Sequence, residues 1–403
     1  MTKGGKDHFE LFEDHTLLKH LILDKYLKRW AAKLLSGWSE IWFVDAFAGE
    51  GSDHQGNPGS PLIAAKVAEG ALRAHGPNAQ GRSPMRVLAI ELDTVRFGRL
   101  QSVMRPFVEA APRIAHVANG TLHTWVDQLV ARSEDKPVLY FIDPFGVDTD
   151  VWQDLQKLLS GPHDEVFALF SDVGAKRLYS VLLSEDRDVE YEVGQVLAAP
   201  SLFEHMTVED AEAKRVEAEA ANRARRSTQP SAERILTEAL GADSIEQLAA
   251  VPKDEQRAAA ARLFMNRLRQ AGAKYVISLP VRDTDNARVY QLVHASKAKA
   301  AVQAMKQAMS EALNSSSLPD GVKASIQAEL HLEVGEVVRE IARRFSGQEV
   351  LWTDGKDRGD SETVRRFLLE DTPAFPWQLR SVKEGLADHA YQIRARKTAF
   401  RFP

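Results

Sequence analysis

Acidic and amide side chains come at the ends of three apolar segments of this 403-residue chain. Asp45 ends the first segment, Glu91 ends the second, and Asn119 follows the third. If these segments are neighbouring parallel strands, the three side chains lie at the same edge of a sheet. A carboxylate at the tip of such a strand can accept hydrogen bonds from both hydroxyls of a ribose. The spacing therefore indicates a nucleoside-binding site.

Two glycines, Gly49 and Gly51, follow Asp45 in the segment FAGEG. Residues without side chains let a ligand lie against backbone N–H groups near the start of a helix. A tight turn from a strand into a helix uses the same residues, so both interpretations remain open. The chain has no GxxxxGK[ST] motif, and its FAGEG turn lacks the GxGxxG pattern of nicotinamide binders. These absences argue against both of those nucleotide-binding classes.

A fourth apolar segment, residues 138–142, leads directly into Asp143-Pro144-Phe145-Gly146. This tetrapeptide resembles the [N/D]PP[YF] loop of enzymes that methylate exocyclic amines. In that loop the Asp or Asn side chain and the following carbonyl accept hydrogen bonds from the amine, while the aromatic ring stacks on the base. Here Phe145 replaces the second proline and Gly146 the aromatic residue. Asp143, Pro144 and Phe145 are the candidate catalytic residues; the alternative is that Asp143 only caps the next turn.

Basic and aromatic residues alternate in the last part of the chain, from Trp377 onward. Cations that contact phosphates are typical of nucleic-acid-binding surfaces. The elements expected there, two helices and a terminal hairpin, are typical of a winged helix-turn-helix. Many winged helices bind proteins instead, so both kinds of partner remain open. The candidate nucleic-acid-binding residues are Gln378, Arg380, Lys383, Arg394, Arg396 and Lys397.

Strands that alternate with helices must position these residues. Apolar runs without polar alternation predict parallel strands that are covered on both faces of the sheet. A hairpin that begins at residue 275 then adds an antiparallel strand at the edge. We therefore expect an α/β fold with a mostly parallel, Rossmann-like sheet. The predicted strands are 41–44, 87–90, 114–117, 138–142, 166–170, 275–281 and 288–294.

The sequence pattern divides the chain into four parts. Apolar residues at helical spacing over 14–35 predict an amphipathic helix in the N-terminal segment. The alternation of strands and helices is interrupted once by a charged, helical insertion, which we interpret as a solvated, salt-bridged surface. A separate unit follows the segment SSSLPDG. The predicted boundaries are 1–36 for the N-terminal segment, 37–172 with 253–314 for the α/β domain, 173–252 for the insertion and 322–403 for the winged-helix-like unit.

The N-terminal helix also carries His15, Lys19 and His20. The two histidines are five residues apart and therefore lie on different faces of a helix, which argues against a metal site. We interpret all three residues as solvated or capping. No metal site is predicted for this chain.

The composition excludes several classes of chemistry. The chain has no cysteine, so it offers no disulfide bond, no thiolate nucleophile and no cysteine-ligated zinc or iron–sulfur cluster. Its 52 basic and 57 acidic residues give a net charge of −5, which by itself indicates no class of partner. The sequence has neither a leader-like apolar segment nor a run long enough to span a bilayer. We expect a cytoplasmic protein without membrane contact.

The order of these motifs resembles the Rossmann-like S-adenosylmethionine-dependent methyltransferases: an acid, a glycine-rich turn, a second acid, and Asp-Pro after the fourth strand. Further segments resemble the bacterial three-Cys-motif partner (TcmP) family. Members of that family are encoded beside a protein with a three-cysteine motif, which is itself similar to radical S-adenosylmethionine enzymes. The family's usual loop reads DGFAGPG, whereas this chain has Ala46 and Glu50 in place of the first Gly and the Pro. The segments that carry the resemblance are HTLLKHLILDKYLKRW (15–30), WFVDAFAGEGS (42–52), PGSPLIAAKVA (58–68), VLYFIDPFG (138–146) and the region from YQLVHAS to Met305.

The resemblance implies S-adenosylmethionine as the cofactor and a methyltransferase acting on nucleic acid. The alternative is a non-catalytic, nucleic-acid-binding subunit that partners a three-Cys-motif protein, and the altered loop after the fourth strand favours it. In the first hypothesis the methionine end of the cofactor lies near the two glycines, the ribose near the second acid and the adenine near the amide. The implied cofactor-binding residues are Asp45, Phe47, Gly49, Gly51, Glu91 and Asn119.

Overall fold

A computed structural model describes residues 7–53, 56–133, 136–144, 150–183, 232–282, 289–318, 323, 326, 334–352, 363–371, 375–387, 391–392 and 398–402. Its central feature is a seven-stranded sheet with the order β3-β2-β1-β4-β5-β7-β6. The strands are parallel except β7, which runs antiparallel to both of its neighbours. The predicted α/β fold with a mostly parallel sheet is confirmed, but the antiparallel strand is not at the edge, because β7 lies between β5 and β6. The strands are β1 (Ile41–Asp45), β2 (Met85–Glu91), β3 (Ala115–Asn119), β4 (Val138–Ile142), β5 (Glu165–Phe170), β6 (Tyr275–Arg282) and β7 (Val289–Ser296).

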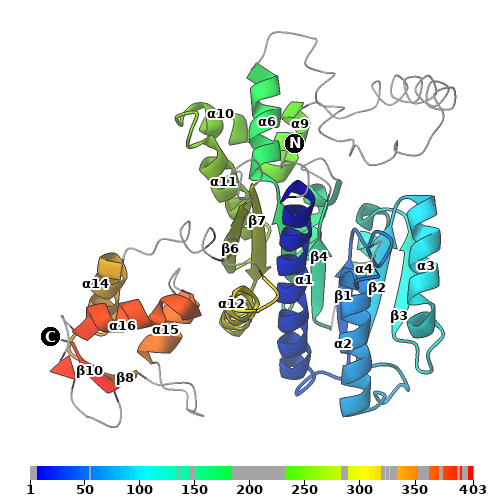
Figure 1. Ribbon diagram of the computed structural model, residues 1–403, viewed down its shortest axis with the longest axis horizontal. Coiled ribbons are helices and arrows are strands. Elements are labelled where there is room, and N and C mark those ends of the chain that lie inside the picture. Colours follow the sequence, from blue (N-terminus) through cyan, green and yellow to red (C-terminus); the bar gives the residue numbers. More distant parts are fainter. Residues whose placement is uncertain are drawn as a thin grey trace.

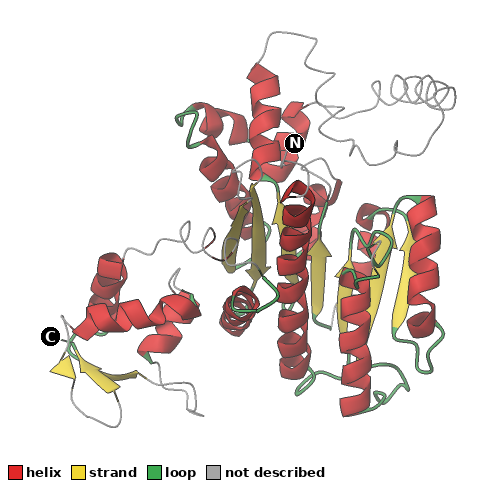
Figure 2. Ribbon diagram, in the orientation of Figure 1, coloured by secondary structure: helices red, strands yellow, loops and turns green. Residues whose placement is uncertain are grey.

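Helices cover both faces of this sheet (Figure 2). Every residue of β1 and β4 is buried, which explains why these strands, apart from the terminal Asp45, are apolar and do not alternate with polar residues. One face packs on α1 (Asp7–Leu34), α2 (Ser60–His75), α3 (Thr94–Val108) and α12 (Lys299–Leu313). The other face packs on α4 (Leu122–Ser133), η1 (Asp150–Asp154), α5 (Leu155–Leu158), α6 (Asp172–Leu183), α9 (Ala232–Leu240), α10 (Ser244–Ala249) and α11 (Gln256–Gln270).

The register of the central strands places the predicted site residues at one edge. Asp45 of β1 lies level with Ala89 of β2 and Phe141 of β4. Glu91 and Asp143 therefore each lie two residues beyond Asp45 in the direction of the strands. Because the strand order reverses between β1 and β4, this edge is the topological switch point of the sheet, where open α/β sheets bind ligands.

Helix α1 lies along the sheet between α2 and α12 (Figure 1). Leu18, Ile22 and Leu23 are fully buried on its inner side. A buried polar network fixes the helix further along: Glu165, the first residue of β5, accepts hydrogen bonds from the Tyr26 hydroxyl and from Trp30 Nε1 (3.2 Å). His294 Nε2 lies 2.8 Å from the same carboxylate. The helix is thus held by apolar packing and by this network. The network lies at the N-terminal end of β5, whereas Asp45 lies at the C-terminal end of β1.

The C-terminal unit has its own core, which lies beside α12 (Figure 1). Its described elements are α14 (Val334–Arg344), β8 (Glu349–Trp352), α15 (Val364–Asp371), η3 (Pro376–Gln378), α16 (Leu379–Ala387), β9 (Tyr391–Gln392) and β10 (Thr398–Arg401). The strands form an antiparallel sheet in the order β8-β10-β9. This is the expected order of elements, and assignment to the winged-helix class stays a prediction.

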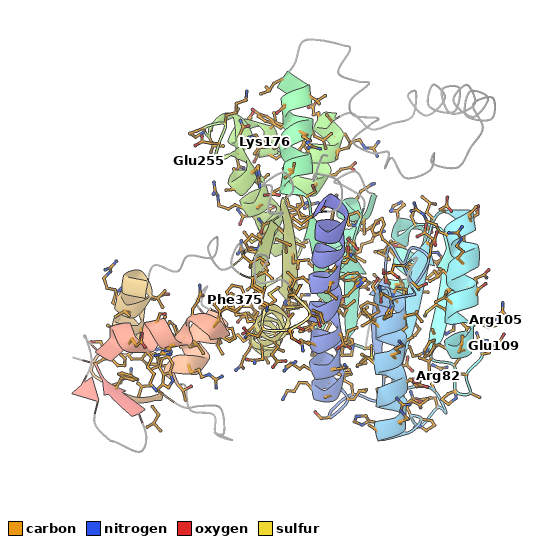
Figure 3. The ribbon with its side chains drawn as sticks, in the orientation of Figure 1. Arg82, Arg105, Glu109, Lys176, Glu255 and Phe375 are labelled. Atoms are coloured by element: carbon orange, nitrogen blue, oxygen red, sulfur yellow. The ribbon has the colours of Figure 1, made fainter. Side chains whose placement is uncertain are left out.

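Phe375 joins the C-terminal unit to the α/β domain. It stacks on Trp377 at a centroid distance of 4.5 Å, and both rings pack against the core cluster of α1 and α12. The buried Lys306 of α12 lies over the Phe375 ring at 5.7 Å. Figure 3 shows Phe375 where the unit meets α12. Among the residues that the structure covers, no helix combines the length and apolar character needed to cross a bilayer.

Candidate functional site

Asp45 is a fully buried carboxylate at the end of β1. Its Oδ1 accepts a hydrogen bond of 3.2 Å from the Phe47 amide, whereas its Oδ2 has no hydrogen-bond partner among the described residues. Burial, and to a smaller extent the charge of Asp143, raise the pKa of Asp45 to about 7. The nearby Ser60 side chain, the Phe47 amide and the charge of Lys19 act in the opposite direction. Oδ2 of Asp45 can therefore accept a hydrogen bond from a ligand at the switch point.

The glycine-rich turn lies between Asp45 and the tip of β2. Gly49 and Gly51 have φ angles of 59° and 84°, a region that favours glycine. The Gly49 N–H donates a hydrogen bond of 2.9 Å to Glu91 Oε2, while the amide of Phe47 in the same turn binds Asp45. Both acidic strand tips thus contact one turn, so Asp45 and Glu91 flank the glycine-rich turn as predicted.

Glu91 is buried, and both of its oxygens accept backbone hydrogen bonds. Oε2 binds Gly49, and Oε1 accepts a hydrogen bond of 2.8 Å from the Asp93 amide. Asp93 in turn caps α3 by accepting hydrogen bonds from the amides of Val95 and Arg96. Each carboxylate oxygen can still accept a second hydrogen bond, so a ribose hydroxyl is compatible with this arrangement.

Asn119 connects β3 to the tip of β2. Its side-chain nitrogen donates to the backbone oxygens of Glu91 (2.8 Å) and Leu92 (3.0 Å). The amide NH2 group is therefore used inside the chain, which leaves the side-chain oxygen as the group for a ligand. Leu92, which follows Glu91, is 64% exposed and offers an apolar surface next to these polar groups. Leu92 was not among the predicted site residues; its position directly after Glu91 was the available signal.

Asp143 follows β4 and forms an ion pair with Lys19 of α1. The two side chains are only 21% and 13% exposed, respectively. Pro144 is half-buried, and the third candidate catalytic residue, Phe145, lies outside the described residues. The interpretation of Lys19 as a solvated or capping residue is wrong, because its ammonium group reaches the loop after the fourth strand.

His20 lies beside this ion pair. Burial, with a further contribution from the charge of Lys19, lowers its pKa to about 4. The imidazole is therefore neutral at pH 7 and adds no charge to the group formed by Lys19, Asp143 and Asp45. The pattern that could have revealed both residues is their place one helical turn before the buried Ile22 and Leu23.

The side chain of Glu50, between the two glycines, points toward α3 and forms an ion pair there. Its carboxylate accepts a hydrogen bond of 2.6 Å from Arg99. The two residues line a hollow of about 410 Å³ between the turn and α3, together with Ser52, Val95, Gly98, Ser102 and Val103. Phe47, the remaining predicted cofactor residue, is half-buried and packs against the core on the face of α4 and α6.

The structure describes three of the six predicted nucleic-acid-binding residues. Gln378 Oε1 accepts a hydrogen bond of 2.9 Å from the Phe375 amide, so this side chain caps η3. Arg380 is exposed and pairs with Glu384 at 2.9 Å, and Lys383 lies over the Trp352 ring at 5.6 Å. The other three, Arg394, Arg396 and Lys397, lie outside the described residues.

Comparisons with known proteins give matches only among solved structures. No protein-family model and no curated protein matches the chain. The chain is similar to protein LPL1258 from Legionella pneumophila (14% identity, TM-score 0.23, 44% of this chain and 72% of that one). It is also similar to a putative sarcosine dimethylglycine methyltransferase from Galdieria sulphuraria (10%, 0.25, 67% and 85%) and to PKMT2 from Rickettsia typhi in complex with AdoHcy (10%, 0.31, 70% and 56%). The fold assignment above rests on the strand order and pairing of the chain itself.

Proposed function

We propose that this chain is an S-adenosylmethionine-dependent methyltransferase that acts on nucleic acid in the bacterial cytoplasm. One observation carries the proposal: the unpartnered Oδ2 of the buried Asp45 lies at the switch point of the sheet, beside a glycine turn that is fixed by Glu91. Nucleoside ligands of open α/β sheets bind at this edge. The strand order, with β7 antiparallel, also fits the methyltransferase class that the sequence resembles.

The residues present fit such a cofactor. Asp45 Oδ2 would complete its hydrogen bonding with the ammonium group of the methionine end, and burial strengthens this attraction. Glu91 keeps acceptor positions for the ribose hydroxyls, and Leu92 offers an apolar surface for the adenine ring. Gly49 and Gly51 keep side chains out of the turn, and Asn119 holds the tip of β2 in place.

The chemistry requires alignment more than acid–base residues. When bound, the cofactor supplies a sulfonium methyl group: the electron pair of an acceptor atom forms a bond to the methyl carbon as the carbon–sulfur bond breaks, and an acceptor nitrogen then loses a proton. Asp143 lies at the tip of β4, where its carboxylate would accept a hydrogen bond from an acceptor amine. Asp143 lies two residues beyond the level of Asp45 in the direction of the strands. From there its carboxylate would orient the acceptor toward the cofactor.

Calorimetry with S-adenosylmethionine, S-adenosylhomocysteine and NAD tests the cofactor class. We expect micromolar or tighter binding of the first two compounds and none of NAD. Transfer of labelled methyl from S-adenosylmethionine to total RNA, sheared genomic DNA or protein then tests the reaction. Tight cofactor binding without labelled product in any pool would remove the catalytic proposal.

The proposed nucleic-acid surface is tested in the full chain. Arg380→Ala should weaken salt-sensitive binding of RNA or DNA, because Arg380 is exposed on α16. Arg105→Ala is the matched control, since Arg105 is an exposed arginine at the far end of α3 (Figure 3). Equal binding by both variants and the unaltered chain would reject a role for Arg380.

A second candidate function is a non-catalytic subunit that binds nucleic acid and partners a three-Cys-motif protein. The departure of the loop after β4 from the amine-methylating pattern, with Phe145 and Gly146 at its last two positions, favours this candidate. Binding of S-adenosylmethionine without methyl transfer, together with co-purification with a three-Cys-motif protein, would support it over the first.

A further inference from the structure

Lys19 lies on the face of α1 that packs against the sheet. Ile22, Leu23 and Tyr26 follow it by three, four and seven residues and are fully buried. Side chains at these spacings share one face of a helix. Placing an ammonium group in this stripe costs desolvation that an aliphatic side chain would avoid. Stability alone is therefore a weak reason for a lysine at this position.

The docking of α1 does not depend on Lys19. Tyr26 and Trp30 already bind the buried Glu165, and Tyr26 lies seven residues, or about 10 Å along the helix axis, from Lys19. The apolar residues between them complete the attachment. The ion pair of Lys19 with Asp143 is thus additional to an anchor that stands without it.

The charge of Lys19 acts on two carboxylates at the proposed site. It pairs with Asp143 Oδ2, and its field also favours the ionised form of Asp45. The neighbouring His20 is neutral at pH 7 and does not add to this charge. Lys19 therefore contributes to the electrostatic environment of the two carboxylates at the switch point.

We propose that Lys19 is a positioning residue for the acceptor side of the methyl-transfer site, an inference that rests on the proposed function. Its ammonium group holds Asp143 through Oδ2, which leaves Oδ1 to accept a hydrogen bond from the N–H of an acceptor. The same positive charge opposes a cationic sulfonium and does not oppose the neutral thioether that remains after transfer. Lys19 thus favours the product form of the cofactor over the substrate form.

The first test needs no acceptor and compares two ligands that differ by one positive charge, that of the sulfonium. Calorimetry at low salt measures the affinities of Lys19→Met for S-adenosylmethionine and S-adenosylhomocysteine. We expect the ratio of the two affinities to shift toward S-adenosylmethionine by at least about threefold. The matched control is Lys28→Met, which removes an exposed ion pair with Asp24 on the same helix and should leave the ratio unchanged. An unchanged ratio in Lys19→Met overturns the inference.

The second test measures transfer of labelled methyl to total RNA and sheared genomic DNA. We expect Lys19→Met to lower kcat by at least about tenfold with no rise in the KM for S-adenosylmethionine. Lys19→Arg should recover part of the loss, because it retains the charge but not the shape of the ammonium group. If Lys19→Met is misfolded by circular dichroism, Lys19→Gln replaces it. A normal rate in the folded variant overturns the inference.

The two proposals fail in different ways. If the unaltered protein binds neither S-adenosylmethionine nor S-adenosylhomocysteine, the proposed function is wrong. If it binds both but transfers no methyl group to any acceptor, the catalytic part of the proposed function is wrong while the cofactor site stands. If the unaltered protein binds both and transfers methyl, and folded Lys19→Met has the same affinity ratio and the same kcat, the inference about Lys19 alone is wrong.

Discussion

The backbone N–H of Gly49 donates a hydrogen bond of 2.9 Å to Oε2 of Glu91. Because Glu91 Oε1 also binds the Asp93 amide, one carboxylate ties the glycine turn after β1 to the start of α3. This arrangement fixes the turn before any ligand binds. A fixed site loses less entropy on binding than a site that must be ordered.

Glu91→Ala should weaken S-adenosylmethionine binding by about 10- to 100-fold. The substitution removes both the anchor of the turn and the acceptor proposed for the ribose, and hydrogen bonds to charged groups contribute about 1.5–3 kcal/mol. Calorimetry measures the effect. Glu50→Ala is the matched control, since Glu50 pairs with Arg99 and has no proposed ligand contact. Unchanged affinity in Glu91→Ala would contradict the ribose assignment.

The raised pKa of Asp45 predicts a pH dependence of folding. Burial raises its pKa from 3.8 to about 7, so the folded state binds a proton more tightly than the unfolded state does. Below pH 3.8 the carboxyl group is neutral in both states and costs no stability. Between pH 3.8 and 7 the cost grows, and above pH 7 it is constant at roughly 4 kcal/mol. Asp45→Asn should therefore be more stable than the unaltered chain at pH 8 and show no such gain at pH 4, as urea unfolding would measure.

The same carboxylate should couple cofactor binding to proton release. If an ammonium group binds Asp45, the ionised form is favoured and affinity should rise as the pH increases through about 7. Calorimetry at pH 7 in buffers of different ionisation enthalpy should then show release of up to about half a proton, because Asp45 is about half protonated at that pH. Asp45→Asn should bind weakly and release none. A buffer-independent enthalpy in the unaltered protein would refute the pairing.

The fold could be predicted from the sequence because its central strands have a clear local pattern. β1 and β4 are buried at every position, and apart from the terminal Asp45 they therefore appear as unbroken apolar runs. Asp45 and Glu91 follow such runs directly, so their common edge follows from parallel pairing. The hydrogen bond from Gly49 to Glu91 was not predicted, because Gly49 was assigned to the methionine end of the cofactor and Glu91 to the ribose.

Other contacts depend on tertiary packing that no local pattern records. Lys19 and Asp143 are separated by 124 residues, and only the docking of α1 on the sheet brings them together. Trp377 begins the basic and aromatic segment that was expected to contact nucleic acid, yet its ring stacks on Phe375 against the core. Gln378 likewise serves as a local cap of η3.

The two glycines of the turn should differ in their tolerance of alanine. A Cβ at Gly51 would lie 3.1 Å from Leu100 and 3.3 Å from Val103, and the φ of 84° adds strain. A Cβ at Gly49 would meet nothing within 4 Å, so only the cost of the left-handed conformation remains. We expect Gly49→Ala to lower the free energy of unfolding by about 1 kcal/mol and Gly51→Ala by about 2–4 kcal/mol. Urea unfolding measures both, and equal losses would argue against the contact with α3.

Tyr26→Phe should separate the anchor of α1 from the proposed site. The substitution removes a buried hydroxyl that donates to Glu165, and the loss of one partner of a buried charged group costs about 1–3 kcal/mol. Because Glu165 begins β5 at the opposite edge of the sheet from Asp45, the affinity for S-adenosylmethionine should stay within about twofold. The half-buried Tyr275→Phe is the control and should change the free energy of unfolding by less than about 0.5 kcal/mol. A loss of cofactor affinity in Tyr26→Phe without a loss of stability would show that the network acts on the site and does not merely hold the helix.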